Sequence, residues 1–397
     1  VNPVEARGLS AIMPTYARYP LTLVRGQGTR VWDDRGNTYL DFAGGIAAMP
    51  LGHSHPAWVR AVTDQVATLT HVSNLFSTDP QEHLARRLAN LAGFGSVFLA
   101  NSGAEANEAA LKIVRKFGRS RGRLDVVAIE GSFHGRTFAT LAATGQPAKW
   151  APFAPLPDGF VHVPPGDAAA LDAAAGPRTA AILLEPVLGE GGLRPLPTGY
   201  LALARRLCDE RGALLVMDEV QTGIGRCGAW FAFQRYGVVP DVITLAKGLG
   251  GGLPIGACLA REDLAFGPGE HASTFGGGPV PCAGALAVLD VIEHEGLLEN
   301  CVLRGSELLE GLAESGAPGM TAVRGLGLLV GAEFEDDRAG RLVRALIDRG
   351  FLATEAGPTV VRFAPPLSVT AEEVAKVVAA FPVAAREAAG GASRAAS

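Results

Sequence analysis

The stretch that decides the fold is VMDEVQTGIGRCGAWFAFQRYGVVPDVITLAKGLGGG, residues 216–252. It overlaps two short apolar runs, 213–218 and 241–246; the first ends at Asp218, and the second is followed by Lys247 and a Gly-rich loop. Apolar runs of this length, separated by helical patterns, are typical of parallel strands buried on both faces of an α/β sheet. Because such sheets bind ligands beyond the carboxyl ends of their strands, we expect Asp218 and Lys247 at one site.

Similar patterns extend in both directions along the chain. We predict further strands over 96–100, 125–129, 180–185 and 255–260, and helices over 57–69, 80–93, 101–118 and 283–316, the last as a long connector between domains. The final helix is expected to begin with a capping box from Thr370 to Glu373. The expected fold class is α/β: a large domain with a mostly parallel sheet covered by helices, and a smaller α+β domain.

The length and composition agree with two domains. The chain has 397 residues, of which 48% are hydrophobic and 19% are charged, and single cores seldom grow beyond about 250–300 residues. We divide it into an N-terminal segment that contributes to the small domain, a large domain, a C-terminal small domain and a tail, at 1–55, 56–290, 291–390 and 391–397.

Charge and cysteine content narrow the function classes. A net charge of −5 leaves no basic excess to follow a phosphate backbone, so nucleic acid is not an expected partner. The five cysteines are scattered and include no CxxC pair, which favours reduced thiols over disulfides or a zinc site. With no apolar run long enough to span a bilayer and no signal-peptide pattern, we expect a soluble cytoplasmic protein without a membrane partner.

Lysine is scarce, which draws attention to Lys247. Lysine occurs only at 112, 116, 149, 247 and 376, and the other 30 basic residues are arginine. Unlike arginine, lysine can lose its proton and attack a carbonyl, and burial at the end of an apolar strand favours the neutral amine. We therefore predict that Lys247 forms a Schiff base, against the alternative of a surface lysine in a loop; the other four lysines are expected to be solvated.

A Schiff-base lysine that serves pyridoxal phosphate needs a carboxylate, a phosphate cradle and a stacking group. Asp218 would pair with the pyridine nitrogen, although an N-cap aspartate is an equal alternative on residue type alone. Phe133, just past the strand 125–129, would stack on the ring, against the alternative of a core position. The cradle would be the helix start at Ser102, Gly103 and Ala104, where free N–H groups follow a strand.

Two other patterns favour a structural interpretation. The glycines of TGIGRCG, 222–228, match GxGxxG, but they lie deep in the chain and lack an acidic residue at the expected distance, so dinucleotide binding is the weaker alternative. His53 and His55 in LGHSHP have no third ligand beside them. We predict a polar loop there and no metal site.

The long stretch 216–252, together with NSGAEANEAALK, FHGRT, EPVLGEGG, STFGGGP and VRFAPPL, resembles the subgroup III aminotransferases of the fold-type I pyridoxal-phosphate enzymes. The 29 residues from Asp218 to Lys247 fit that family. Within it, LGHSHP, HVSNLFST and GQPAKWAPFAPLP are most similar to acetylornithine aminotransferases. The resemblance covers nearly the whole chain and implies seven strands in the large sheet and a homodimer with active sites at the subunit interface.

The resemblance also implies residue roles. Lys247 would hold the cofactor and shuttle a proton, Arg362 would bind the α-carboxylate of glutamate or 2-oxoglutarate, and Glu190 would neutralise Arg362 when the donor amine is terminal. Arg136 would bind a carboxylate of the acylated substrate. The remaining implied contacts are Val220 and Gln221 with the cofactor, the latter at its 3′-oxygen, Thr274 from the other subunit with its phosphate, and Ser273 near Arg136.

The implied reaction transfers the terminal amino group of N2-acetyl-L-ornithine to 2-oxoglutarate. It gives N-acetylglutamate 5-semialdehyde and glutamate, a step of arginine biosynthesis with small amino-acid and 2-oxo-acid substrates. Another ω-aminotransferase, acting on ornithine, 4-aminobutyrate, succinylornithine or carrier-linked lysine, is the main alternative. A dinucleotide-binding protein is the alternative from a different class.

Overall fold

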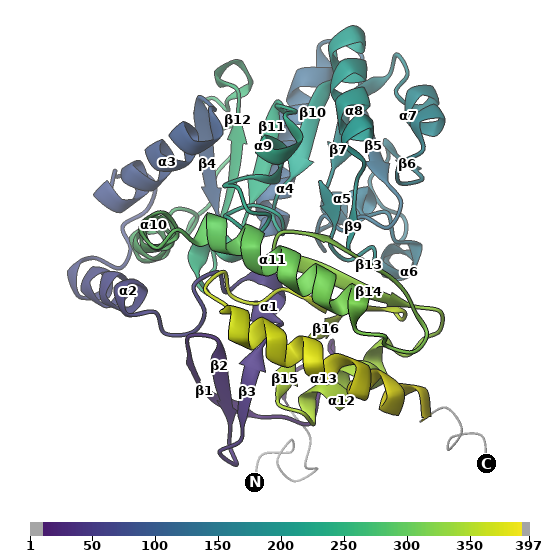
Figure 1. Ribbon diagram of the computed structural model, residues 1–397. Coiled ribbons are helices and arrows are strands. Elements are labelled where there is room, and N and C mark those ends of the chain that lie inside the picture. Colours follow the sequence, from purple (N-terminus) through teal and green to yellow (C-terminus); the bar gives the residue numbers. More distant parts are fainter. Residues whose placement is uncertain (1–10, 391–397) are drawn as a thin grey trace.

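The computed structural model describes residues 11–390 (Figure 1). Its larger part is built on a seven-stranded sheet in the order β4-β12-β11-β10-β7-β5-β6. β12 runs antiparallel to both neighbours, whereas the pairs from β11 to β6 are parallel, so the predicted mostly parallel seven-stranded sheet is confirmed. The strands are β4 (Ser96–Ala100), β5 (Asp125–Ile129), β6 (Phe160–Val163), β7 (Thr179–Leu184), β10 (Leu214–Asp218), β11 (Val242–Leu245) and β12 (Gly256–Ala260).

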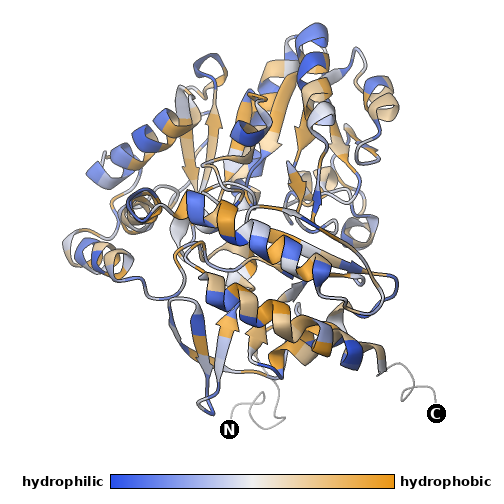
Figure 2. Cartoon of the chain, viewed as in Figure 1, coloured by the Kyte–Doolittle hydropathy of each residue, from blue (hydrophilic) through white to orange (hydrophobic). Residues whose placement is uncertain are grey.

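The inner strands are apolar because both faces of the sheet are covered. Every residue of β7, β10, β11 and β12 is buried, and Figure 2 shows these strands mainly in the hydrophobic colour while the outer helices carry stripes of both kinds. Six strands match predicted runs. β6 was not predicted, because this edge strand is short and only its last residue is buried.

Helices alternate with these strands along the chain. α4 begins directly after β4 and contacts β11 and β12, which places its first turn at the edge of the sheet. Within residues 11–390 no helix is both long and apolar enough to cross a membrane. The helices of this part are α2 (Pro56–Thr68), α3 (Asp79–Ala92), α4 (Gly103–Arg119), α5 (Phe138–Ala143), α6 (Pro147–Trp150), α7 (Ala168–Ala174), α8 (Thr198–Arg211), α9 (Ala232–Tyr236) and α10 (Pro279–His294), with 3₁₀ turns η2 (Ala151–Phe153), η3 (Lys247–Gly250) and η4 (Glu262–Leu264).

The prediction of one helix over 283–316 is wrong. The chain forms α10, which ends at His294, and a separate helix α11 (Leu297–Glu314). Gly296 lies between them with φ of 65°, in the left-handed region that glycine adopts without a Cβ penalty, and this breaks the helical path. The apolar pattern continues across the break, so periodicity did not reveal it.

The smaller part joins the two ends of the described chain. β15 (Phe351–Leu352) pairs in parallel with β3 (Thr38–Asp41), which brings the N-terminal sheet beside the C-terminal helices (Figure 1). The boundaries 1–55, 56–290 and 291–390 stay a prediction, and residues 391–397 lie outside the described residues. The other elements are β1 (Leu23–Gln27), β2 (Arg30–Asp33), α1 (Gly44–Ala47), β8 (Val187–Leu188), β9 (Arg194–Pro195), β13 (Met320–Leu326), β14 (Leu329–Phe334), α12 (Ala339–Ile347), β16 (Thr354–Glu355), β17 (Val360–Phe363) and α13 (Ala371–Gly390).

A capping box begins α13, and an apolar core joins the two parts. The predicted capping box is confirmed, because Thr370 N donates to Glu373 Oε2 (3.1 Å) and Glu373 N donates to Thr370 Oγ1 (3.2 Å) at the start of α13. One continuous cluster of buried side chains runs from Leu84 of α3 to Phe381 of α13. The larger and smaller parts of the fold therefore share one apolar core.

Candidate active site

The site lies at the carboxyl edge of the seven-stranded sheet. Asp218 is the last residue of β10, and its register partner Thr244 on β11 stands three residues before Lys247. Both Asp218 and Lys247 line a cavity of about 450 Å³. The structure thus brings together the two residues that the strand pattern selected.

Most of the other predicted residues line the same cavity, but three do not. Arg362 lies behind the cavity lining and bonds Glu190, which is part of that lining. Ser273 likewise bonds a lining residue, because its Oγ lies 3.2 Å from the Nδ2 of Asn101. Thr274 lines a separate small hollow with His71. The predicted residues that line the main cavity are Ser102, Gly103, Ala104, Phe133, Arg136, Glu190, Asp218, Val220, Gln221 and Lys247.

Lys247 has a strained backbone and a weakly basic amine. Its φ of 43° lies in the left-handed region, which is uncommon for a residue with a side chain and is found where a site demands it. Burial is the main cause that lowers the pKa of Lys247, and the nearby positive charge of Arg362 adds to it, while the carboxylates of Glu190 and Asp218 oppose it. A larger share of neutral amine is therefore present than in a solvated lysine.

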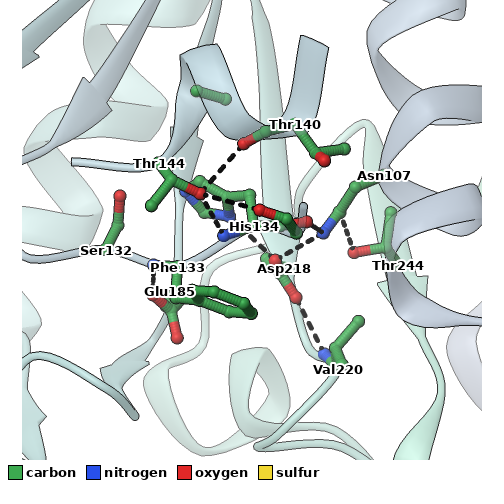
Figure 3. A network of polar contacts seen from close by, with 12 residues as sticks. Asn107, Ser132, Phe133, His134, Thr140, Thr144, Glu185, Asp218, Val220 and Thr244 are labelled. Carbon is green, nitrogen blue, oxygen red and sulfur yellow. Dashed lines mark hydrogen bonds and ion pairs between the residues drawn. The ribbon is translucent and has the colours of Figure 1, made fainter. Parts of the chain in front are cut away.

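A network of buried donors holds the Asp218 carboxylate (Figure 3). Its Oδ2 accepts from Asn107 Nδ2 (2.7 Å) and from His134 Nδ1 (2.8 Å), and its Oδ1 accepts from the Val220 N–H (3.0 Å). Asn107 in turn accepts a bond from the Thr244 hydroxyl (2.7 Å). Sequence reasoning missed Asn107 and His134, although both lie inside the motifs NSGAEANEAALK and FHGRT.

Glu185 is a second buried carboxylate that the sequence reasoning missed. It accepts bonds from the backbone N–H groups of Phe133 (2.8 Å) and Gly189 (3.2 Å), and it lines the cavity. Burial raises the pKa of Glu185, and the neighbouring Asp218 adds to the rise. By fixing the backbone at Phe133, Glu185 sets the place of the predicted stacking ring (Figure 3).

The start of α4 has the features of an anion cradle. Ser102 is the N-cap, and its hydroxyl accepts a bond from the Glu105 N–H (3.2 Å). The N–H groups of Gly103 and Ala104 have no partner within the helix, and the helix dipole favours negative charge there. A Cβ at Gly103 would come within 2.8 Å of a Val220 methyl group, so the close approach at this turn requires glycine.

Arginine side chains and one carboxylate form the charged end of the site. Arg362 is 2% exposed, and its Nη1 bonds Glu190 Oε1 at 2.5 Å while its Nε donates to the Thr354 hydroxyl at 3.0 Å. Burial disfavours the charged form of Glu190, but the positive charges, chiefly Arg362, outweigh it and lower the pKa of Glu190. Arg136 lies 5.5 Å from the centre of the Phe133 ring. Such cations suit a substrate with two carboxylates.

The residues present fit pyridoxal phosphate. A lysine with a lowered pKa, a buried aspartate and a helix N-terminus share one cavity, and the Gln221 Oε1 is buried without a hydrogen-bond partner among the described residues. An unpartnered buried oxygen of this kind is rare unless a ligand group completes the site. The cavity therefore offers the groups that the cofactor requires.

The TGIGRCG and LGHSHP patterns, considered above for dinucleotide and metal binding, make contacts within the fold. Gly225 and Gly228, with φ of 84° and 79°, turn the TGIGRCG loop so closely that a Cβ would lie 2.8 Å from Leu367 and 2.5 Å from Val302 respectively. His53 bonds Asp41 (2.8 Å) and His55 bonds Glu295 (3.2 Å). Across residues 11–390, no group of three or more His, Cys, Asp or Glu side chains is placed to hold a metal ion.

Comparisons with known proteins agree with this geometry. The family model for class-III aminotransferases matches residues 12–384. The acetylornithine aminotransferase of Mycolicibacterium smegmatis is 50% identical, with 96% of this chain and 97% of that protein covered. That of Streptomyces coelicolor is 51% identical, with 95% and 94% covered.

Solved structures give the same result at the level of the fold. The ornithine aminotransferase from Toxoplasma gondii superposes with a TM-score of 0.91 at 33% identity and covers 96% of this chain and 94% of its own. The N-acetylornithine aminotransferase from Stenotrophomonas maltophilia has a TM-score of 0.83 at 38% identity, with 95% and 98% covered. The similarity thus extends over both parts of the fold.

Proposed function

Because this chain belongs to the class-III aminotransferase family, we propose that it transfers the terminal amino group of N2-acetyl-L-ornithine to 2-oxoglutarate with pyridoxal phosphate as cofactor. The products are N-acetylglutamate 5-semialdehyde and glutamate. The observation that carries the proposal is the bond from Arg362 to Glu190, a residue that lines the same cavity as Lys247 and Asp218. Identities near 50% to acetylornithine aminotransferases over nearly the full chain support the substrate.

Different cavity residues would bind different parts of the cofactor. Asp218 would hold the pyridine nitrogen in its protonated form, and Gln221 would bond the 3′-oxygen. Phe133 would cover the ring, and the first turn of α4 at Gly103 and Ala104 would bind the phosphate. When bound, pyridoxal phosphate supplies an electron sink that stabilises negative charge on the carbon that loses its proton.

Lys247 performs the proton transfer. In the first half of the reaction, its neutral Nζ takes the proton from the substrate carbon that carries the amine. In the second half, the same group gives a proton to the carbon of the 2-oxo acid that receives the amine. A base works best when its pKa lies near the working pH. The lowered pKa of Lys247 supports this role, since an ordinary lysine holds its proton too tightly.

Arg362 and Glu190 would let one site accept two different substrates. The terminal amine of N-acetylornithine has no carboxylate beside it, so Glu190 stays on Arg362 and neutralises that buried charge. The α-carboxylate of 2-oxoglutarate needs Arg362 itself, as a bidentate partner. Arg136 would hold the distant carboxylate in both cases.

A second copy of the chain would complete the site. Leu75, Phe76 and Phe275 are 87%, 66% and 64% exposed around the hollows lined by Ser273 and Thr274. Large apolar side chains that gather on a surface mark an interaction site. We assign this surface to a homodimer in which Thr274 reaches the phosphate of the partner's cofactor, so light scattering should give twice the chain mass of 41.0 kDa.

The cysteines support a place in the cytoplasm. All five are buried free thiols, and burial raises the pKa of Cys208 to about 12. Buried, protonated thiols are unreactive and need no oxidising compartment. We therefore expect the enzyme in the cytoplasmic fraction of its source.

An amino-donor panel tests the substrate. With 2-oxoglutarate as acceptor, N-acetylornithine should give the highest kcat/KM, above ornithine, 4-aminobutyrate and succinylornithine. If N-acetylornithine were among the poorest donors, the substrate proposal would be wrong while the family assignment stands. A colourless protein that binds a nicotinamide dinucleotide would overturn the cofactor as well.

A further inference from the structure

Lys149 lies beside two residues that line the active-site cavity, and the expectation that it is solvated is wrong. It belongs to the short helix α6 and its side chain is 23% exposed. Its Nζ lies 4.7 Å from the centre of the Phe133 ring and 4.0 Å from Glu190 Oε2. Sequence separation hid this neighbourhood, because α6 and Glu190 come from different segments.

Glu190 stands between two cations. Its Oε1 bonds Arg362 at 2.5 Å, while its Oε2 faces the Lys149 ammonium group at 4.0 Å. The second distance is too long for a hydrogen bond, and within residues 11–390 no hydrogen bond from the Lys149 ammonium group is found. The lysine therefore has unused donors aimed at a carboxylate that another residue already holds.

The proposed reaction requires Glu190 to leave Arg362 when a 2-oxo acid arrives. Glu190 is only 26% exposed, so a displaced carboxylate cannot recover full hydration. Two other cations lie nearby: Lys247, whose charge also lowers the pKa of Glu190, is the reacting amine, and Arg136 binds the distant carboxylate of the substrate. Lys149 is the remaining positive group that already faces the carboxylate.

The charges around Lys149 agree with such a role. Burial lowers the pKa of Lys149, Glu190 opposes that change, and Arg136 adds to it. A carboxylate that moved closer would therefore stabilise the charged ammonium group and would be stabilised in return. Before Glu190 moves, a cation–π contact with the Phe133 ring stabilises the Lys149 ammonium group.

We propose that Lys149 is a positioning residue that receives the Glu190 carboxylate when a 2-oxo acid takes Arg362. This exchange lowers the free-energy cost of separating Glu190 from Arg362. Lys149 therefore favours the half-reaction with the 2-oxo acid and leaves the half-reaction with the amino donor unchanged. This inference rests on the proposed function, because it needs a substrate pair in which only one member carries a carboxylate beside the reacting carbon.

The first test separates the two half-reactions in the Lys149→Met holoenzyme. The KM for 2-oxoglutarate should rise about tenfold, equivalent to about 1.4 kcal/mol, while kcat and the KM for the amino donor stay within about twofold. Lys376→Met is the matched control, since Lys376 bonds only Glu372 on the exposed side of α13 among the contacts of the described residues. An equal loss in both half-reactions would mean that Lys149 binds the distant carboxylate itself, and no change would also overturn the proposal.

The second test measures binding without turnover and so does not depend on the identity of the amino donor. Glutarate, a dicarboxylate that can engage Arg136 and Arg362, is titrated into the holoenzyme by calorimetry. Lys149→Met should weaken glutarate about tenfold, but in the Glu190→Gln background it should have no further effect, because the carboxylate that Lys149 receives is gone. A Lys149 effect that persists beside Glu190→Gln would refute the mechanism, whereas a failed donor panel with the predicted glutarate pattern would refute only the substrate.

Discussion

Asn107→Leu removes the centre of the network that holds Asp218. The Asn107 side chain is 2% exposed and makes three short bonds: to Asp218 Oδ2 (2.7 Å), to the His134 carbonyl (2.8 Å) and from the Thr244 hydroxyl (2.7 Å). Leucine has a similar volume and leaves no large cavity. The substitution therefore tests the polar contacts themselves.

The magnitude follows from those three bonds. Losing a hydrogen bond to a charged group costs about 1.5–3 kcal/mol, and each buried neutral partner left unsatisfied costs about 1–3 kcal/mol. Allowing for partial relaxation, we expect the free energy of unfolding to fall by about 4 kcal/mol. With only His134 and Val220 left to hold Asp218, the Kd for pyridoxal phosphate should rise about tenfold, equivalent to about 1.4 kcal/mol.

Urea unfolding of the cofactor-free protein and titration with pyridoxal phosphate measure the two effects. Asn300→Leu is the matched control, because Asn300 Nδ2 donates to the carbonyls of Leu367 (2.6 Å) and Val369 (3.0 Å), and none of these three residues lines the cavity. It should lose stability and keep cofactor affinity. Wild-type affinity in Asn107→Leu, or an equal loss of affinity in Asn300→Leu, would refute the reasoning.

Two further substitutions test other groups. Lys247→Ala should reduce turnover by at least about a thousandfold and abolish the visible absorption band of the bound cofactor; a variant that turned over normally would exclude Lys247 as the reacting amine. Burial raises the pKa of Glu219 from 4.5 to about 7, so the folded state binds its proton more tightly and stability falls as the pH rises across that window. Glu219→Gln should remove up to about 3 kcal/mol of this decline, seen as a flatter plot of Tm against pH, and parallel plots for both proteins would contradict it.

Local patterns predicted the fold where burial is two-sided. The runs 241–246 and 255–260 contain β11 and β12, in which every residue is buried, because a strand covered on both faces must be apolar throughout. The same reasoning fails at the edge strand β6, whose burial is one-sided, and at Gly296, where the backbone conformation and not the hydrophobic pattern separates two helices. Periodicity reports burial, and it says little about a break that leaves burial unchanged.

Local patterns also predicted some residues of the candidate site and not others. Asp218 and Lys247 could be predicted because each ends or follows a buried strand, and strand ends meet at one edge. Asn107, His134 and Glu185 were missed because their partners come from elements far apart in the chain. A buried polar residue acquires its role from what faces it, and that information is not present in the flanking sequence.

The scarcity of lysine applies to Lys149 as well as to Lys247. In a chain that uses arginine at 30 of 35 basic positions, one lysine, Lys247, lines the cavity and a second, Lys149, faces Glu190 of its lining. An arginine at position 149 could bind Glu190 with two parallel bonds and would compete with Arg362 at all times. The compact ammonium group of Lys149, 4.0 Å from Glu190, would bind this carboxylate only after Arg362 has released it. Lysine therefore suits a partner that must exchange during each cycle, just as a deprotonatable amine suits Lys247.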